Sequence, residues 1–436
     1  MFADLLDTLT PLRVAILGFG REGRSTYAFL RKHFPQKPLL IADKAQLSLE
    51  DENVTLLCGD NYLDVLRRCD LCVKTPGISL RGVEIPASVR VSCQTDLFLR
   101  YAPCVSIGVT GSKGKTTTAT LIFEMLRAAQ IPALLLGNMG VPTLDYLENV
   151  ENSIAVIEMS SHQLEFTTVS PHIAVWTNLY EEHLDHYNNG FAGYAAAKAH
   201  ICGAQTAEDY VIYCPNQSPL VDEIVAATQS NAIPVRLNDQ AENPFLQRLA
   251  MVRSDRLRGN HNLQNIFFAE RAARLCGADD ESIARTAAWY AGTPHRLESL
   301  GTFDGIEWVD DCIATIPEAV LRGIEALETV DTLIFGGLDR GIDYGSFAEQ
   351  LAKTSVRHFI CMPETGHVIA KRLADYCDGQ SIVSVQSLEE AVSAARALTQ
   401  RGSICLLSPA AASYNRYKNF EEKGAHFISL VTAIGN

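Results

Sequence analysis

Val105-Ser-Ile-Gly-Val-Thr-Gly-Ser-Lys-Gly-Lys-Thr-Thr-Thr118 is the stretch that decides the fold of the middle of this chain. Its apolar start, residues 105–109, predicts a buried parallel strand, and residues 116–129 are expected to form a helix. The glycines between them let backbone N–H groups approach phosphate oxygens, and the helix N-terminus adds partial positive charge. The order of strand, glycine-rich turn and helix therefore predicts a phosphate-binding loop.

The loop carries the side chains that nucleotide binding needs. Lys115 is expected to reach the outer phosphates, and the Thr116 hydroxyl can hold Mg²⁺. The spacing departs from the standard loop, because Val109 stands where that loop has its first glycine. An ordinary glycine-rich turn between a strand and a helix is the alternative interpretation. The residues expected to bind the nucleotide here are Gly111, Ser112, Lys113, Gly114, Lys115, Thr116 and Thr117.

A second glycine-rich turn, Gly-Phe-Gly-Arg-Glu-Gly, occupies residues 18–23. An apolar strand precedes it, a helical stretch follows it, and the next predicted strand ends in Asp43. This context is typical of a Rossmann-like nucleotide site in which the acidic residue reads a ribose or base. Glycines that only permit tight packing, or a dinucleotide oxidoreductase, are the alternatives, although hydride transfer does not need a second phosphate loop. The residues expected to bind here, with the turn after the strand at 71–73, are Gly18, Phe19, Gly20, Asp43, Thr75, Pro76 and Gly77.

Three further side chains lie after predicted strands or in a helix beyond the phosphate loop. Glu158 comes directly after a strand, where a carboxylate can ligate Mg²⁺ across from Thr116. His183 follows another strand with carboxylates close to it in sequence, which favours a metal or phosphate role over a purely structural one. Lys198 is the only cation in its short predicted helix, and an ordinary solvated lysine is the usual interpretation of such a residue.

Composition bounds the class of protein. A net charge of −14 argues against nucleic acid or an anionic membrane as the main partner, and the chain has no run of eighteen apolar residues. Twelve cysteines are scattered along the chain, which is typical of reduced thiols in a cytoplasmic protein. We therefore expect a cytoplasmic protein that does not insert into a membrane.

The length of 436 residues and the repeated alternation of strands and helices predict a three-domain α/β protein. The limits are expected at residues 1–97 for a Rossmann-like domain and 98–293 for a central nucleotide-binding domain with a mostly parallel sheet. A second Rossmann-like domain is expected over residues 294–436.

Seven motifs occur in an order and at a spacing that together point to a family: Thr110-Gly-Ser-Lys-Gly-Lys-Thr-Thr, Gly137-Asn-Met-Gly, Glu158-Met-Ser-Ser, residues 178–185, Gly259-Asn-His-Asn, Pro294-His-Arg and residues 408–424. The chain resembles the Mur ligases of peptidoglycan synthesis over essentially its whole length. The signature at 408–424 is similar to that of the glutamate-adding branch, whereas the phosphate loop is shared with folate-polyglutamating relatives.

The resemblance implies an ADP-forming ligase that uses ATP and Mg²⁺. Its implied reaction adds D-glutamate to UDP-N-acetylmuramoyl-L-alanine through an acyl phosphate, with the UDP group held by the first domain. A monomer is expected. A folylpolyglutamate synthetase-like ligase and a nucleotide-dependent binding protein are the remoter alternatives, and the first of these would lack the glycines of the N-terminal turn.

The resemblance also assigns roles to single residues. Lys115, His183 and Lys198 would be catalytic, with Lys198 carbamylated, and the metal ligands would be Thr116, Glu158, His183 and Lys198. Asn138 and His183 would touch the muramyl substrate. The nucleotide would also contact Asn265, Arg296 and Asp311, and the glutamate would contact Thr315, Arg340, Ser413 and Phe420.

Two departures from the family pattern fall in the implied glutamate pocket. Ile313 stands where the family has a lysine, and Arg340 stands where a lysine usually pairs with a glutamate carboxylate. Arginine makes a planar, bidentate contact where lysine acts as a point charge. The same ligation with L-glutamate is therefore an alternative.

Overall fold

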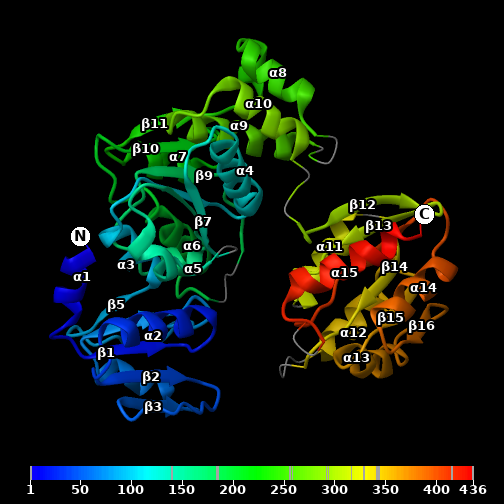
Figure 1. Ribbon diagram of the computed structural model, residues 1–436, viewed down its shortest axis with the longest axis horizontal. Helices are drawn as coiled ribbons and strands as arrows, with labels where there is room; N and C mark the ends of the chain where they lie inside the picture. The colour runs from blue at the N-terminus through cyan, green and yellow to red at the C-terminus, as the bar shows by residue number, and fades with distance from the viewer. Residues whose placement is uncertain are drawn as a thin grey trace. The chain divides into compact units, whose positions relative to one another are not determined.

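The computed structural model describes residues 2–138, 141–182, 186–254, 257, 259–290, 292, 294–315, 317–327, 329–339, 344–413 and 416–434. Contacts divide the chain into two compact units, residues 1–290 and 291–436. The first unit holds two β-sheets and the second holds one (Figure 1). The predicted α/β fold with mostly parallel sheets is confirmed, while the domain limits at 97/98 and 293/294 stay predictions.

The N-terminal sheet has five parallel strands in the order β3-β2-β1-β4-β5. Chain order reverses between β1 and β4, and ligands of open α/β sheets bind at such switch points. The strands are β1 Val14–Leu17, β2 Leu39–Asp43, β3 Val54–Cys58, β4 Leu71–Lys74 and β5 Arg90–Ser92. The helices are α1 Phe2–Leu9, α2 Arg21–His33, the short 3₁₀ helix η1 Tyr62–Arg67 and α3 Gln94–Tyr101.

The central sheet has six parallel strands in the order β11-β10-β9-β6-β8-β7. Its strands are β6 Ser106–Thr110, β7 Ala133–Gly137, β8 Ile154–Glu158, β9 Ile173–Trp176, β10 Tyr210–Tyr213 and β11 Asn231–Pro234. Its helices are α4 Lys115–Ala128, η2 Thr143–Asn149, α5 Ser161–Leu164, α6 Gly190–Ala199, α7 Pro219–Ala226, η3 Leu237–Ala241, α8 Pro244–Val252, α9 Asn260–Leu275 and α10 Asp280–Trp289.

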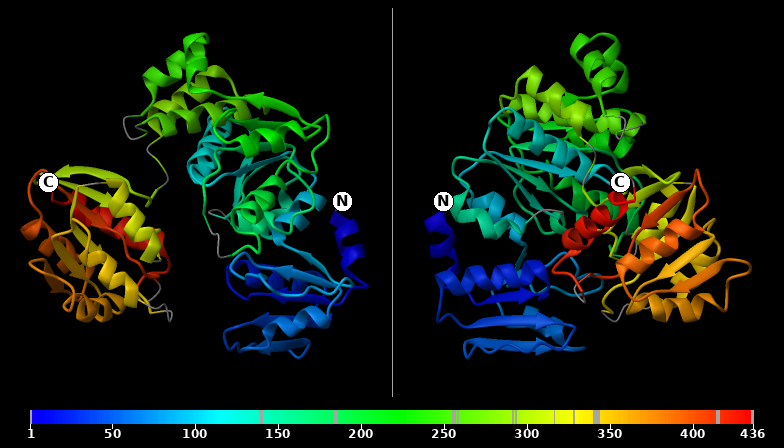
Figure 2. Two further views of the ribbon diagram at one scale, coloured as in Figure 1. Left: turned by 180° about the vertical axis from the view of Figure 1, so that it is seen from behind. Right: turned by 45° about the vertical axis from the view of Figure 1, so that its right-hand side comes forward.

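Two apolar layers fix the central sheet. Helices α4, α9 and α10 pack together on one face, and Figure 2 shows them in cyan and green from two further directions. On the other face, Trp176 and Tyr194 belong to a core that continues into the N-terminal sheet through Ile16 and Phe98. Because one buried core spans both sheets, the N-terminal sheet is anchored to the central one.

The sheet of the second unit has the order β12-β13-β17-β14-β15-β16, with β12 antiparallel to β13 and the other pairs parallel. Its strands are β12 Glu298–Phe303, β13 Ile306–Asp310, β14 Val330–Phe335, β15 His358–Cys361, β16 Ser381–Ser384 and β17 Ile404–Leu407. Its helices are α11 Pro317–Leu327, α12 Gly345–Ala352, α13 Thr365–Leu373, α14 Leu388–Leu398 and α15 Phe420–Thr432.

All twelve cysteines are free thiols, as expected. Among the residues that the structure describes, no helix is both long and apolar enough to cross a membrane.

Candidate functional site

The loop between β6 and α4 needs glycine at two positions. Gly111 has φ 147°, and a Cβ there would lie 1.9 Å from Thr177 Oγ1. Gly114 has φ 81°, and a Cβ there would lie 2.5 Å from Asn265 Oδ1 on α9. Side chains at either position would collide with fixed neighbours, so the loop reaches its shape only with hydrogen there.

Neighbouring segments brace this loop from outside. Asn178, just after β9, accepts a hydrogen bond from Lys113 N at 2.7 Å and donates to Lys113 O at 3.0 Å. The Ser112 hydroxyl lies 2.9 Å from the Tyr194 hydroxyl of α6. We did not predict these bracing roles, and the only sequence signal was that Asn178 directly follows a strand, where loops of parallel sheets converge.

Two lysines meet at one backbone oxygen of the loop. Lys115 Nζ and Lys198 Nζ both donate to Gly111 O, at 2.9 Å and 2.7 Å. Lys198 is 1% exposed, so the solvated lysine suggested by its residue type alone is wrong. Burial, with repulsion from Lys115, lowers the pKa of Lys198 well below its ordinary value. The structure therefore places a buried amine with weakened basicity against the phosphate loop.

Glu158 lies beside the loop because β8 pairs with β6, with Val109 opposite Glu158. Asn138 Nδ2 donates to Glu158 Oε1 at 3.0 Å. Glu158 Oε2 is buried and has no hydrogen-bond partner among the described residues. A buried carboxylate oxygen with no partner is costly, and together with the hydroxyl of Thr116, in the first turn of α4, it offers the hard oxygen donors that Mg²⁺ prefers. The residues present fit a magnesium ion.

Of the other predicted or neighbouring residues of the central site, the structure describes Asn265 and Glu182 but not His183. Asn265 is buried on α9 and accepts from Thr118 Oγ1 at 3.3 Å, so it lies against the helix that the loop opens. Glu182 forms an ion pair with Lys113, with Nζ and Oε1 2.5 Å apart. His183 lies outside the described residues, and so does Arg340 of the second unit.

The N-terminal turn lies at the switch point between β1 and β4. Gly18 has φ 93°, and a Cβ there would lie 2.0 Å from Thr75 Oγ1. Both oxygens of Asp43 accept backbone N–H groups, from Phe19 at 2.7 Å and from Ala45 at 2.9 Å. Asp43 thus holds the turn itself, a contact that the sequence did not predict. Gly20 and Gly77 are exposed, and Pro76 is half-buried beside them.

In the second unit, Asp311 follows β13 and is buried. It accepts a hydrogen bond from Ser408 Oγ at 2.7 Å, and burial raises its pKa to about 7. Leu297 N, next to Arg296, donates to its other oxygen at 3.2 Å. Ser413 Oγ is buried without a hydrogen-bond partner in the described part of the chain, which leaves it available to a ligand. Thr315 lies near the start of α11.

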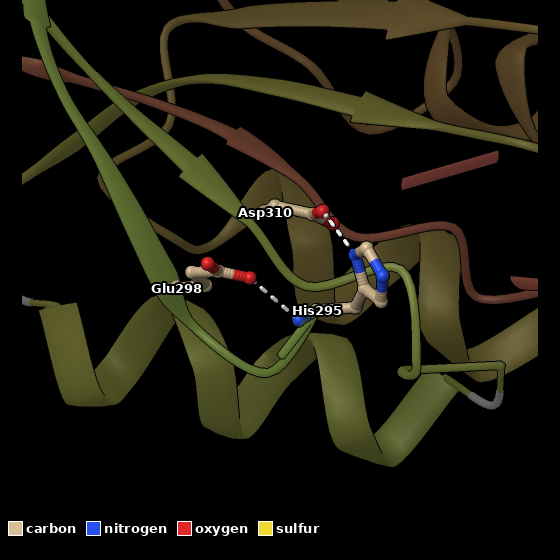
Figure 3. A group of neighbouring side chains, drawn as sticks. All are labelled: His295, Glu298 and Asp310. Carbon is tan, nitrogen blue, oxygen red and sulfur yellow. Dashed lines mark hydrogen bonds and ion pairs between the residues drawn. The ribbon is translucent and has the colours of Figure 1, made fainter. Parts of the chain in front are cut away.

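A histidine and two carboxylates gather near the start of this unit (Figure 3). His295 Nδ1 lies 2.7 Å from Asp310 Oδ2, and His295 N donates to Glu298 Oε2 at 2.8 Å. The hydrogen bond to Asp310 raises the pKa of His295. The ring of Phe420, at the start of α15, meets the His295 ring edge-on at a centroid distance of 6.2 Å. The His295 ring therefore lies next to Phe420, one of the residues predicted to bind glutamate.

Comparisons with known proteins agree with this architecture. Residues 109–273 match the Mur ligase middle domain, and residues 295–411 match the Mur ligase glutamate ligase domain. A UDP-N-acetylmuramoylalanine–D-glutamate ligase from Symbiobacterium thermophilum is 34% identical over 87% of this chain and 88% of its own length. The chain belongs to the Mur ligase family. An enzyme of the same name from Streptococcus agalactiae is 31% identical, with 98% of this chain and 99% of its own length covered.

Both of these relatives bear the name of D-glutamate ligases, the branch that the sequence motifs favour. The crystal structure of the MurF ligase from Thermotoga maritima in complex with ADP shares the fold, with a TM-score of 0.51 and 15% identity over 99% of both chains. The protein is thus a ligase by family.

Proposed function

We propose that this Mur ligase joins D-glutamate to UDP-N-acetylmuramoyl-L-alanine, converting ATP to ADP and phosphate. The observation that carries the proposal is the meeting of Lys115 and Lys198 at Gly111 O, beside the partnerless oxygen of Glu158. That arrangement concentrates positive charge and an oxygen ligand where a triphosphate would lie against the loop. The curated relatives carry the name of this reaction.

The chemistry requires activation of a carboxylate, which is a poor electrophile. The alanyl carboxylate takes the γ-phosphoryl group of ATP to give an acyl phosphate and ADP. The amine of glutamate then attacks the acyl carbon, loses a proton and displaces phosphate. Lys115 would stabilise charge on the transferring group, since phosphoryl transfer depends mainly on positioning and electrostatic stabilisation. His183 or a nearby carboxylate would accept the proton.

Magnesium completes the site in this proposal. Two Mg²⁺ ions, held by Thr116, Glu158, His183 and carbamylated Lys198, would neutralise charge on the phosphoryl oxygens. Carbamylation needs a neutral amine: the nitrogen forms a bond to CO₂ and releases one proton. The buried, weakly basic amine of Lys198 meets that need, because its pKa is lowered by burial and by Lys115.

Substrate recognition is divided between the sheets. The N-terminal turn with Gly18, Phe19, Gly20, Asp43 and residues 75–77 would hold the UDP group, and Asn138 would touch the muramyl part. Gly111–Thr117, Asn265, Arg296 and Asp311 would bind the adenine nucleotide. Thr315, Arg340, Ser413 and Phe420 would bind glutamate. We also propose a cytoplasmic monomer.

Phosphate release with each glutamate enantiomer tests the function. We expect release from ATP only when UDP-N-acetylmuramoyl-L-alanine, D-glutamate and Mg²⁺ are all present. Release with ATP alone would support a nucleotide-dependent binding protein instead, and release with neither enantiomer would contradict the proposal.

L-Glutamate is the second candidate substrate, because Ile313 replaces the family's lysine in the implied pocket. Its backbone N–H donates to His295 O at 3.2 Å, so position 313 belongs to the segment that carries the His295–Asp310 pair. Activity with L-glutamate alone would favour this candidate.

A further inference from the structure

Two consecutive residues of the N-terminal turn reach the segment that carries Glu158. Arg21 and Glu22 open helix α2 directly after the glycines proposed to hold UDP. Arg21 Nη2 donates to Asn138 O at 3.2 Å, and Glu22 Oε1 accepts from Gln163 Nε2 at 2.9 Å. Asn138 directly follows β7, and Gln163 lies in α5, which follows β8 and Glu158.

The Asn138 side holds Glu158 at two atoms. Asn138 N donates to Glu158 O at 3.0 Å, and Asn138 Nδ2 donates to Glu158 Oε1 at 3.0 Å. The carboxylate is therefore oriented by a residue whose own carbonyl is bound by Arg21. Its other oxygen stays without a partner within the described part of the chain, and is the one available to a cation.

The Gln163 side fixes the chain just after Glu158. Gln163 Oε1 accepts from Ser160 N at 3.0 Å, and Ser160 Oγ accepts from Gln163 N at 3.3 Å, which closes the capping box of α5. Gln163 is 1% exposed, so its amide has no water to replace a lost partner. Its oxygen accepts from Ser160 and its nitrogen donates to Glu22, so the Glu22 carboxylate holds the Gln163 amide from outside the box.

The position of Glu22 is informative because it lies in the first turn of a helix proposed to face a diphosphate. A carboxylate aimed at that ligand would repel it. The side chain is instead half-buried and accepts a hydrogen bond from Gln163, with Lys74 and Arg21 as the nearby positive charges. The orientation of the Glu22 side chain therefore holds Gln163, in the helix that follows Glu158, rather than the proposed diphosphate.

We propose that Arg21 and Glu22 are positioning residues that hold Glu158 in place for the divalent cation. They thereby connect the N-terminal turn, proposed to hold UDP, to the proposed metal site. The inference rests on the proposed function, since it takes Glu158 as a metal ligand. Removal of partners that orient a ligand typically weakens metal affinity about 10- to 100-fold. Glu22 should matter more than Arg21, because its bond is partly buried and the bond of Arg21 is exposed.

The experiment measures ADP binding by calorimetry over a series of Mg²⁺ concentrations, with no UDP substrate present. We expect Glu22→Ala to raise the Mg²⁺ concentration for half-maximal ADP affinity by about tenfold or more. Arg21→Ala should raise it by a smaller factor. Glu22→Gln should restore most of the affinity, because a carboxamide oxygen can still accept from Gln163.

Lys32→Ala is the matched control. Lys32 lies on the same helix and also reaches the central part of the chain, but it pairs with Glu148 at the end of η2, 2.7 Å away, and not with the Glu158 segment. Its Mg²⁺ dependence should equal that of the wild type. A shift as large as that of Glu22→Ala would overturn the inference, because it would show a general effect of loosening α2.

A double-mutant cycle distinguishes a direct coupling between Glu22 and Gln163 from a general loss of folding. Adding Glu22→Ala to Gln163→Ala should cost little more than Gln163→Ala alone, because the hydrogen bond between the two side chains is already lost with Gln163. Additive effects, or unchanged Mg²⁺ dependence in a folded Glu22→Ala variant, would overturn the inference alone. A wild-type protein whose ADP binding ignores Mg²⁺ would overturn the proposed metal site as well, so the two failures are distinguishable.

Discussion

The two glycine-rich turns of the first unit share a backbone plan and differ in the charges around it. Each follows a parallel strand and opens a helix, and each begins with a glycine against a threonine just after a neighbouring strand. A Cβ on Gly18 would lie 2.0 Å from Thr75 Oγ1, and one on Gly111 would lie 1.9 Å from Thr177 Oγ1. Each threonine hydroxyl also donates to the carbonyl just before its glycine.

The side chains around the two turns have opposite character. The central turn has two lysine amines, those of Lys115 and Lys198, on the carbonyl of Gly111. The N-terminal turn has the carboxylate of Asp43 on the backbone N–H of Phe19, and Glu22 in the following helical turn. Since backbone N–H groups at a helix N-terminus favour anions, we infer that the shared backbone supplies the anion-binding shape and that the charged groups around the central turn add group transfer.

Removing the buried amine should give the largest effect. Lys198→Ala is expected to lower kcat/KM about 10²- to 10³-fold, because it deletes a charged group beside the transferring phosphoryl. Partial recovery on adding acetate would indicate that a carboxylate normally extends from this lysine. Exposed Lys353, paired with Glu349 at 2.6 Å, is the control, and Lys353→Ala should keep wild-type rates. Full activity in Lys198→Ala would remove the proposed difference between the turns.

Alanine substitutions at Gly18 and Gly111 should each weaken the binding of a different substrate. Gly111→Ala is expected to raise KM for ATP about tenfold or more, and Gly18→Ala to do the same for the UDP substrate, because each Cβ collides with a threonine. Steady-state kinetics with each substrate varied in turn checks this. Gly20→Ala is the control for folding, since a Cβ there meets nothing within 4 Å. Equal effects of both substitutions on both KM values would show that the turns do not act on separate ligands.

The local sequence was sufficient to predict the strand, turn and helix that the two sites share. The strands before both turns and the helix from Lys115 follow from apolar runs broken by glycine, and the structure confirms them. Glu158 was also predictable at the edge of the loop, because parallel strands bring their carboxyl ends together.

The charges around the turns depend on packing between distant segments, which a single sequence does not show. Nothing in the short helix around Lys198 reveals that α6 packs its only cation inward against Gly111. The bond between Glu22 and Gln163 joins helices α2 and α5, which flank different sheets, and the pairing of His295 with Asp310 depends on the β12–β13 register. The resemblance to a family supplied the proposed role of Lys198, which residue type alone would not have suggested.

Stability should change in the opposite direction to activity at Lys198. Since its folded pKa is lowered, the unfolded chain binds more protons, and stability rises with pH up to about 10.4, the ordinary lysine value. Lys198→Met, which buries no charge, should therefore melt at a higher temperature than the wild type near neutral pH, and the gap should close as pH approaches that value. Thermal unfolding in CO₂-depleted buffer with EDTA measures this. A gap that does not vary with pH would show that the amine carries no buried charge penalty.

The smallest expected effect concerns Asp43, whose two oxygens accept N–H groups of Phe19 and Ala45. Asn has one oxygen and must set an NH₂ group against one of these donors, at a cost of about 1–3 kcal/mol. Asp43→Asn should therefore lower stability and raise KM for the UDP substrate several-fold, with KM for ATP unchanged. Exposed Asp60→Asn is the control. If Asp43→Asn alters that KM without loss of stability, the carboxylate reads the ligand directly, and the turns then differ in recognition as well as in charge.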